Sequence, residues 1–242
     1  MVLKVIGSSS KGNCYILDNG SEALIVEAGV RFAEIKKALE FRVSKVAGCI
    51  VTHQHNDHSR SIADVAGCGI PTLALPEVWE AKQVTGSRCL AIRPGRGYRF
   101  GGFKVLPFPA CHDVPCVGYL IDHAETGRIM FLTDSFMCEY DFPGLSHVMI
   151  ECNYSDEALA RAICEGRTLP SQRERLMTSH MELHTCGDFL QSLDLGGVAN
   201  VVLLHLSNDN SDEERFVRYI QGVTGKCVYV ANPGMVIDMA RV

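Results

Sequence analysis

The stretch VTHQHNDHSR, residues 51–60, places His53, His55, Asp57 and His58 within six consecutive positions. It continues directly from the apolar run at residues 46–51, which is typical of a buried strand. If the chain leaves this strand on a tight loop that turns into a helix, His53 and His55 can face one metal ion while Asp57 and His58 reach a second. The motif therefore predicts a metal site where a strand ends.

Three other apolar runs end in the same way. The runs at residues 103–111, 129–133 and 201–204 stop at His112, Asp134 and His205. Strand ends anchored in a packed core restrict side-chain positions, as a site with several ligands requires. A lone histidine at a strand end is more often structural, so each of these residues alone is weak evidence. We interpret the four strand ends together as one candidate site.

The chemistry of these side chains narrows the kind of metal site. Imidazole and carboxylate ligands suit zinc, manganese or iron, and no set of thiolates suggests a structural zinc site. The sequence therefore favours an open, catalytic site that contains divalent metal ions.

Composition indicates a protein with a large core. The chain has 242 residues, of which 47% are hydrophobic, and a net charge of −5. We expect one domain spanning residues 1–242. The start of the chain has no basic segment followed by a long apolar stretch, and no run approaches the length of a membrane span, so we expect a cytoplasmic protein with no membrane partner. Eleven cysteines, an odd number without a C-x-x-C pair, fit a reduced compartment.

The charge pattern bears on nucleic-acid binding. A net negative charge disfavours non-specific wrapping of nucleic acid over a wide basic surface, although it does not exclude a local groove. Two basic clusters flank the candidate site segments, and an ordinary solvated face is the simpler interpretation of both: Arg88, Arg93, Arg96, Arg99 and Lys104; Arg167, Arg173 and Arg175.

Apolar periodicity predicts strands and helices in both halves of the chain. We expect an α/β layered sandwich with mixed sheets. The stretch RPGRGYRFGG, residues 93–102, is expected to be a loop and a turn. Helices are predicted at residues 31–40, 59–66, 76–84, 155–165, 184–193 and 211–221. Strands are predicted at residues 3–6, 14–17, 23–26, 46–52, 71–75, 103–108, 117–121, 129–133, 147–151, 198–204, 227–230 and 236–239.

The motifs carry a family resemblance. H-Q-H-N-D-H at residues 53–58, followed by an isolated histidine, a T-D at a strand end and a late L-H-L-S, resembles the metallo-β-lactamase superfamily. The resemblance implies a four-layer αββα sandwich with a two-metal site between its sheets. The strings GSSSKGNCYIL, CHDVPCVGYLI, FLTDSF, IECNYSDE and LLHLSNDN are similar to the small single-domain exonuclease group called YycJ or WalJ.

The resemblance also implies the roles of the ligands. One metal would be held by His53, His55 and His112, the other by Asp57, His58 and His205, and Asp134 would bridge them. Two divalent ions, Asp57, Asp134 and a bridging hydroxide sum to a local charge near +1, which favours an anionic substrate. Asp57 and Asp134 are thus the catalytic carboxylates of a mechanism in which that hydroxide attacks phosphorus.

Other roles rest on the same resemblance, with departures from the family pattern. His180, in TSHMELHT, lies in a polar, helix-like context and is the candidate proton donor, with His184 as a competing candidate. The residues Met181, Glu182 and Leu183 that follow it differ from the usual motif. Glu27 stands where the superfamily usually has an aspartate that supports the metal loop. The residues expected to contact substrate are Ser9, Ser10, Asn13 and Ser207.

Three functions remain open from the sequence. The leading one is a phosphodiesterase that requires two metals, specifically a 5′-to-3′ DNA exonuclease with nucleic acid as its partner. The second is a small-molecule hydrolase that acts on a thioester or lactone, because the same motif serves those reactions. The third is a non-catalytic module that binds metal or nucleic acid. The sequence does not choose the metal, the DNA or RNA preference, or the polarity of digestion.

Overall fold

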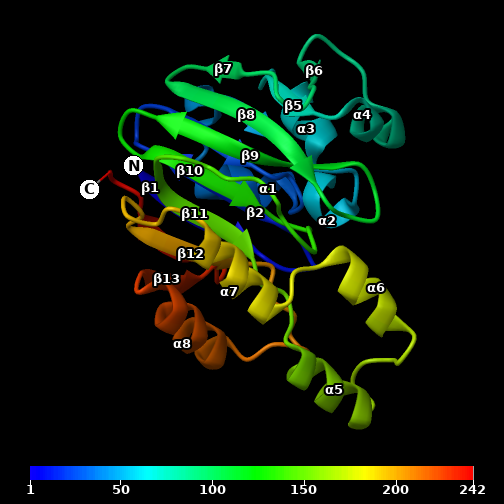
Figure 1. The fold of residues 1–242 in the computed structure, drawn as a ribbon. Helices are drawn as coiled ribbons and strands as arrows, with labels where there is room; N and C mark the ends of the chain where they lie inside the picture. The colour runs from blue at the N-terminus through cyan, green and yellow to red at the C-terminus, as the bar shows by residue number, and fades with distance from the viewer. Residues whose placement is uncertain (242) are drawn as a thin grey trace.

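The computed structural model describes residues 1–241 and contains two seven-stranded sheets with helices on their outer sides (Figure 1). The strand order is β14-β1-β2-β3-β4-β5-β6 in the first sheet and β13-β12-β11-β10-β9-β8-β7 in the second. The strands of the first sheet are β1 (Val2–Gly7), β2 (Cys14–Asp18), β3 (Ala23–Val26), β4 (Val46–Ile50), β5 (Thr72–Ala74), β6 (Cys89–Ala91) and β14 (Val236–Asp238). Those of the second are β7 (Tyr98–Phe100), β8 (Phe103–Ala110), β9 (Cys116–His123), β10 (Gly127–Leu132), β11 (Leu145–Glu151), β12 (Asn200–Leu204) and β13 (Cys227–Val230).

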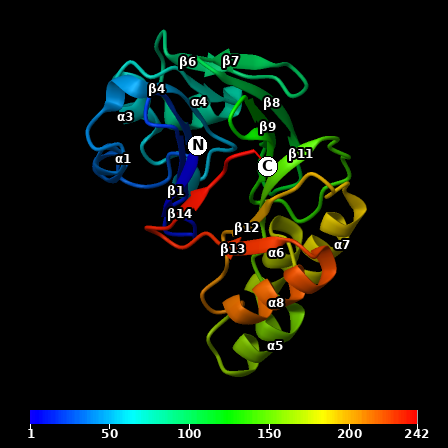
Figure 2. The same ribbon diagram turned by 90° about the vertical axis from the view of Figure 1, so that its left-hand side faces the viewer.

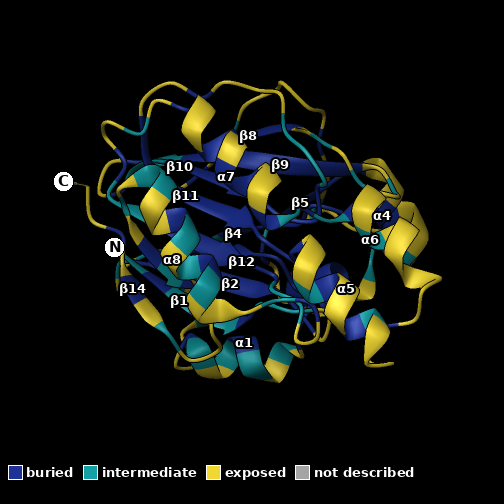
Figure 3. Ribbon diagram, turned by 60° about the horizontal axis from the view of Figure 1, so that its bottom comes forward, coloured by how far each residue is buried: buried dark blue, intermediate teal, exposed yellow. Residues whose placement is uncertain are grey.

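The central strands are apolar on both faces because both faces are covered. In β10, Ile129 and Phe131 point into the core between the sheets, whereas Met130 and Leu132 belong to a second core beneath the helices. Side chains alternate between the two faces of a strand, so a strand covered on both sides is a continuous apolar run. Figure 3 shows these strands in the colour of buried residues.

Helices cover the outer face of each sheet (Figure 2). The first sheet carries α1 (Phe32–Ala38), α3 (Ile62–Gly67) and α4 (Pro76–Lys82), and the second carries α7 (Leu183–Ser192) and α8 (Glu213–Thr224). Short α2 (Asn56–Ser59), a 3-10 turn (Val43–Lys45), α5 (Asp156–Cys164) and α6 (Gln172–Ser179) complete the described elements. The layers confirm the expected αββα sandwich. Within residues 1–241, no helix is both long enough and apolar enough to cross a membrane.

Several local predictions were wrong. Residues 93–102 are not only loop and turn, because Tyr98–Phe100 forms β7 and pairs with the start of β8 through the turn at Gly101 and Gly102. Buried Phe100 anchors this strand against the first sheet at Gly48. The expected helix at residues 59–66 is two short helices, and β6 and α6 were not predicted at all.

A buried ion-pair cluster ties the first sheet to the segment that follows α1. The carboxylate of Asp18 accepts hydrogen bonds from Lys4 Nζ at 2.8 Å and from Lys45 Nζ at 2.7 Å. Burial raises the pKa of Asp18, but these two ammonium groups outweigh that effect and lower it to about 2. The cluster therefore stabilises the fold in its ionised form.

Candidate metal centre

Strand direction brings the candidate ligands to one edge of the second sheet. Strands β10, β11 and β12 are parallel neighbours, and β8 runs the same way because β9 is antiparallel to both β8 and β10. Their carboxyl ends therefore lie together, at or just before His112, Asp134, Glu151 and His205. The loop after β4 meets this edge from the first sheet, since His53 Nε2 lies 3.9 Å from Asp134 Oδ2.

Residues 51–60 form the metal loop, which is held from beneath by neighbouring backbone. The backbone N–H of Asn13 donates to the carbonyl oxygen of Asp57 at 2.7 Å. A Cβ atom on Gly29 would lie 1.6 Å from the same carbonyl oxygen, so only glycine permits this packing. Asn13, expected to contact substrate, is instead fully buried with its amide nitrogen 3.0 Å from His58 Nε2. Its position is that of a support for the loop.

The first donor set consists of His53, His55 and His112. The Nδ1 atom of His55 lies 3.1 Å from His53 Nε2 and 3.3 Å from His112 Nε2. Tetrahedral ligands at 2.0–2.1 Å from a zinc-sized ion are about 3.3 Å apart. The two measured distances match that spacing, and one donor atom from each of the three residues lies within 4.8 Å of the other two.

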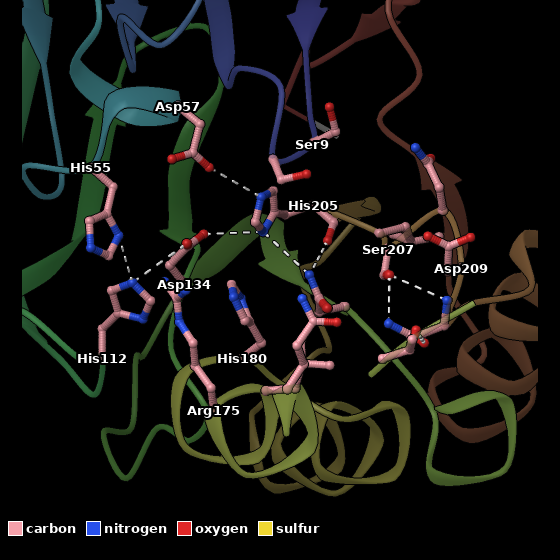
Figure 4. Close-up of a pocket in the computed structure, with 18 of the residues that line it drawn as sticks. Ser9, His55, Asp57, His112, Asp134, Arg175, His180, His205, Ser207 and Asp209 are labelled. Carbon is pink, nitrogen blue, oxygen red and sulfur yellow. Dashed lines mark hydrogen bonds and ion pairs between the residues drawn. The ribbon is translucent and has the colours of Figure 1, made fainter. Parts of the chain in front are cut away.

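The second donor set consists of Asp57, His58, His205 and Asp134. His58 Nε2 lies 3.4 Å from Asp57 Oδ2 and 3.3 Å from Asp134 Oδ1, and His205 Nε2 lies 3.6 Å from Asp57 Oδ2. Asp134 directs its other oxygen, Oδ2, toward the first set, at 3.7 Å from His112 Nε2. One carboxylate therefore faces both sets, as a bridging ligand would (Figure 4).

Oxygen atoms next to the second ring nitrogens orient several of these imidazoles, as is usual around metals. His53 Nδ1 lies 2.9 Å from Thr52 Oγ1, and His112 Nδ1 lies 2.9 Å from the carbonyl oxygen of Ser179. Glu27, the departure from the family pattern, lies beside His58. Glu27 Oε2 lies 3.5 Å from His58 Nδ1, while Glu27 Oε1 accepts the backbone N–H of Thr52 at 3.2 Å.

Backbone strain is concentrated at the site. Among residues 1–241, six non-glycine residues have positive φ, and three of them, Glu27 (68°), Asp134 (48°) and His205 (54°), belong to this cluster. Such conformations cost of order 1–3 kcal/mol each and persist where the surrounding structure holds them. The strain indicates that these side chains are directed to a particular place at the expense of stability.

The donor set fits a pair of divalent ions. His205 Nε2 is buried without a hydrogen-bond partner among the described residues. Burial raises the pKa of Asp134, but His205 and His58 outweigh it and hold that pKa well below its ordinary value. Burial lowers the pKa of His205, while Asp134, Asp57 and Glu151 raise it to about 10. The buried carboxylates need positive charge beside them, and a metal pair supplies that charge when bound.

Sequence reasoning missed Glu151, although it is the last residue of β11. Its Oε1 lies 2.7 Å from His180 Nδ1 and 3.1 Å from His205 Nδ1, and its Oε2 accepts the backbone N–H groups of Ser135 and Met181. The strand-end pattern that identified Asp134 also applies to Glu151. A single acid at a strand end is not distinctive, however, without the histidines that the fold brings to it.

His180 lies in the wall of the pocket rather than within a helix. It follows the last residue of α6 in extended conformation, at φ −133° and ψ 153°, which corrects the helix-like context expected for it. Burial lowers the pKa of His180, but Glu151 and Asp134 outweigh it and raise that pKa. The competing candidate, His184, is exposed on α7 and packs against Tyr219 outside the pocket. The structure therefore favours His180 as the histidine next to a reacting group.

The metal loop and the donor sets open into a pocket of about 650 Å³. Ser9, Ser10 and Ser207 line it as expected, together with His180. Figure 4 shows Ser9, Ser207 and His180 in the same pocket as Asp134. The opposite wall comes from residues 167–176, which the sequence had not placed there.

Comparison with known proteins agrees with the fold. Residues 9–122 match the family model of the metallo-beta-lactamase superfamily. The exodeoxyribonuclease YycJ of Bacillus anthracis is 23% identical over 227 residues, which cover 87% of this chain and 84% of that protein. The exodeoxyribonuclease WalJ of Streptococcus pneumoniae is 22% identical over 235 residues, or 87% of this chain and 83% of that protein.

A solved structure agrees over the length of the fold. The metallo-beta-lactamase fold protein YhfI from Bacillus subtilis superposes with a TM-score of 0.73, covering 98% of this chain and 99% of that one at 17% identity. Residues 9–122 thus match the metallo-β-lactamase superfamily, and the chain has the metallo-β-lactamase fold, with a His/Asp cluster suited to a dinuclear metal site.

Proposed function

We propose that the protein is a phosphodiesterase that uses two divalent metal ions, such as zinc, manganese or iron, and acts on nucleic acid. The observation that carries this proposal is the position of Asp134, which faces both donor sets at the floor of an open polar pocket. Two-metal sites of this kind serve in-line displacement at phosphorus.

The roles of the residues follow from their positions. The first ion would be held by His53, His55 and His112, the second by Asp57, His58 and His205, with Asp134 shared between them. Such a pair supplies an acidified water as nucleophile and neutralises charge that develops on the phosphoryl group.

His180 is positioned as the proton donor to the leaving oxygen. Its Nδ1 is bound by Glu151 at 2.7 Å, which leaves Nε2 as the nitrogen available to a substrate in the pocket. The Glu151 carboxylate stabilises the protonated imidazole, the form that a general acid needs before it acts. The two residues act together in this role, because Glu151 orients the imidazole ring and His180 transfers the proton.

Two observations support nucleic acid as the substrate. Both named relatives are exodeoxyribonucleases, and the alignments extend over most of each chain. The pocket wall offers hydroxyl groups, from Ser9, Ser10 and Ser207, of the kind that bind phosphate and sugar oxygens. We therefore propose DNA, degraded from its 5′ end, as the leading substrate.

A panel of end-labelled single- and double-stranded DNA and RNA tests this function, with the Asp134→Ala variant as the blank. We expect metal-dependent shortening of DNA from the 5′ end, abolished in the variant. If no member of the panel is cleaved with zinc, manganese or iron, the proposal fails. Faster turnover of a generic thioester than of any nucleic acid would favour a small-molecule hydrolase instead.

A further inference from the structure

Residues 156–179, here called the helical arm, contain α5, a connecting loop and α6. The arm extends from the body of the protein between β11 and α7 (Figure 1). In α6 every side chain is exposed except those of Leu176, which is half-buried, and Ser179, which is buried (Figure 3). Helices of this length are marginal in water without packing. Packing against the protein core therefore does not account for the sequence of α6 or for its position at the pocket.

One face of the arm forms the pocket wall opposite Ser9 and Ser10. The arm contributes Arg167, Thr168, Gln172, Arg175 and Leu176 to the lining. The two arginines differ in how firmly their side chains are held. The guanidinium of Arg167 donates to the carbonyl oxygen of Asp209 at 2.7 Å and to the Glu165 carboxylate at 2.7 and 2.9 Å. Its donors are thus already engaged by the protein.

Arg175 is held by a single long contact. Its side chain is 71% exposed, and among the described residues its guanidinium contacts only Asp113, with Nη2 at 3.4 Å from Oδ2. An exposed ion pair of this length contributes little to stability and is easily exchanged. Figure 4 shows the side chain reaching from the arm toward Asp134 and His112.

Asp113 lies between this cation and the metal site. Its other oxygen, Oδ1, lies 3.1 Å from His112 Nε2, a nitrogen of the first donor set. The guanidinium of Arg175 is therefore separated from that ligand by one carboxylate group.

We infer that Arg175 forms a phosphate-binding subsite beside the metal pair, which takes the phosphate next to the scissile one in a nucleic-acid strand. The inference rests on the proposed function and specifies its substrate. The planar guanidinium binds phosphate through two parallel hydrogen bonds, and in doing so it exchanges Asp113 for the substrate. The subsite distinguishes a strand from a simple phosphodiester, because only a strand has a second phosphate to bind.

Short substrates that differ by one phosphate test the subsite. They are the dinucleotide TpT, with only the scissile phosphate, pTpT, with an added 5′ phosphate, and TpTp, with an added 3′ phosphate. For Arg175→Ala, we expect kcat/KM for either pTpT or TpTp, relative to that for TpT, to fall about tenfold, the loss of one charge-assisted contact. Arg173→Ala is the matched control, because Arg173 lies two residues away on the same exposed helix and does not line the pocket. It should keep the wild-type ratios, and Arg175→Lys should recover part of the loss.

Equal ratios in wild type and Arg175→Ala would overturn the inference, and so would an equal fall in Arg173→Ala. A binding measurement separates this result from failure of the proposed function. Fluorescence anisotropy of a labelled single-stranded DNA decamer with metal-free protein should show a salt slope reduced by roughly 0.7 to 1 in Arg175→Ala alone. If the protein cleaves no substrate and the salt slopes still differ, the subsite is supported and the proposed activity is not. If the protein cleaves DNA and both the salt slopes and the kcat/KM ratios are unchanged in Arg175→Ala, the activity is supported and the subsite is not.

Discussion

The substitution Glu151→Gln removes one charge from the pocket while it preserves the shape of the side chain. Glu151 makes four contacts, at 2.7 Å with His180, 3.1 Å with His205, and 3.0 and 3.2 Å with two backbone N–H groups. A glutamine oxygen can still accept both N–H groups, but its NH₂ group then faces the two imidazoles. The Nδ1 atom of His180 becomes an acceptor, and the imidazolium that Glu151 stabilises is lost.

The expected effect is a fall in kcat of about 10²- to 10⁴-fold, the usual contribution of a positioned general acid. Glu151 raises the pKa of His180, so the pKa of His180 should be lower in the variant. As pH rises, the activity of the variant should therefore begin to decline at a lower pH than that of the wild type, which moves the alkaline limb of the pH–rate profile to lower pH. Because His205 is also affected, metal affinity should weaken about 10- to 100-fold. The assay is therefore a pH–rate profile at saturating metal, with metal content measured in parallel.

Glu182→Gln is the matched control. The Glu182 carboxylate accepts the backbone N–H groups of His184 and Thr185 at the start of α7 and contacts no donor set. This variant should keep the alkaline limb in place and kcat close to the wild-type value. The reasoning is refuted if fully metallated Glu151→Gln turns over at nearly the wild-type rate with an unmoved alkaline limb.

Three further predictions concern stability. Removal of metal by a chelator should lower the midpoint of thermal unfolding, because a ligand present at 1,000 times its Kd adds about 4 kcal/mol to the free energy of unfolding. Scanning fluorimetry before and after metal is restored measures this change. An unchanged midpoint argues against a resident metal pair. Gly29→Ala should lower the free energy of unfolding by about 1–3 kcal/mol and reduce metal content, because its Cβ would lie 1.6 Å from the carbonyl oxygen of Asp57. Urea unfolding beside Gly67→Ala, where no atom lies within 4 Å of the added Cβ, tests this, and equal losses would contradict it. Asp18 has a pKa lowered to about 2, so its contribution to the free energy of unfolding is present above about pH 4 and is lost as pH falls toward 2. In urea unfolding, the free energy of unfolding of Asp18→Asn should therefore decline less over that pH range than that of the wild type. If the two proteins lose stability equally over this range, the ion pairs contribute nothing.

The sequence located most of the candidate site because its signals are local. The H-x-H-x-D-H spacing lies within one loop, and a strand that ends in a donor can be recognised from hydrophobic periodicity alone. His112, Asp134 and His205 were found in this way, and the structure places them beside the metal loop. Their binding of metal stays a prediction. The family resemblance and the αββα class, in contrast, are confirmed by the fold and the comparisons.

Other features had no readable local signal. Helix α6, with the sequence QRERLMTS, has no apolar period because it packs against little of the core. Strand β7 was missed because its glycine-rich surroundings are typical of a loop, whereas its formation depends on pairing with β8. Asn13 was expected in the pocket, but the turn that contains it folds beneath the metal loop.

By itself, the sequence determined most of the buried strands and most of the donors that stand at their ends, because burial on both faces of a sheet leaves a continuous apolar run. Only the tertiary structure decided how those donors group: that Asp134 faces both sets, that Glu151 binds His180, and that Arg175 meets Asp113 across 62 positions of the chain. Periodicity reports the surroundings of each segment separately. The convergence of side chains depends on the packing of two sheets and on strand direction, which no single segment encodes.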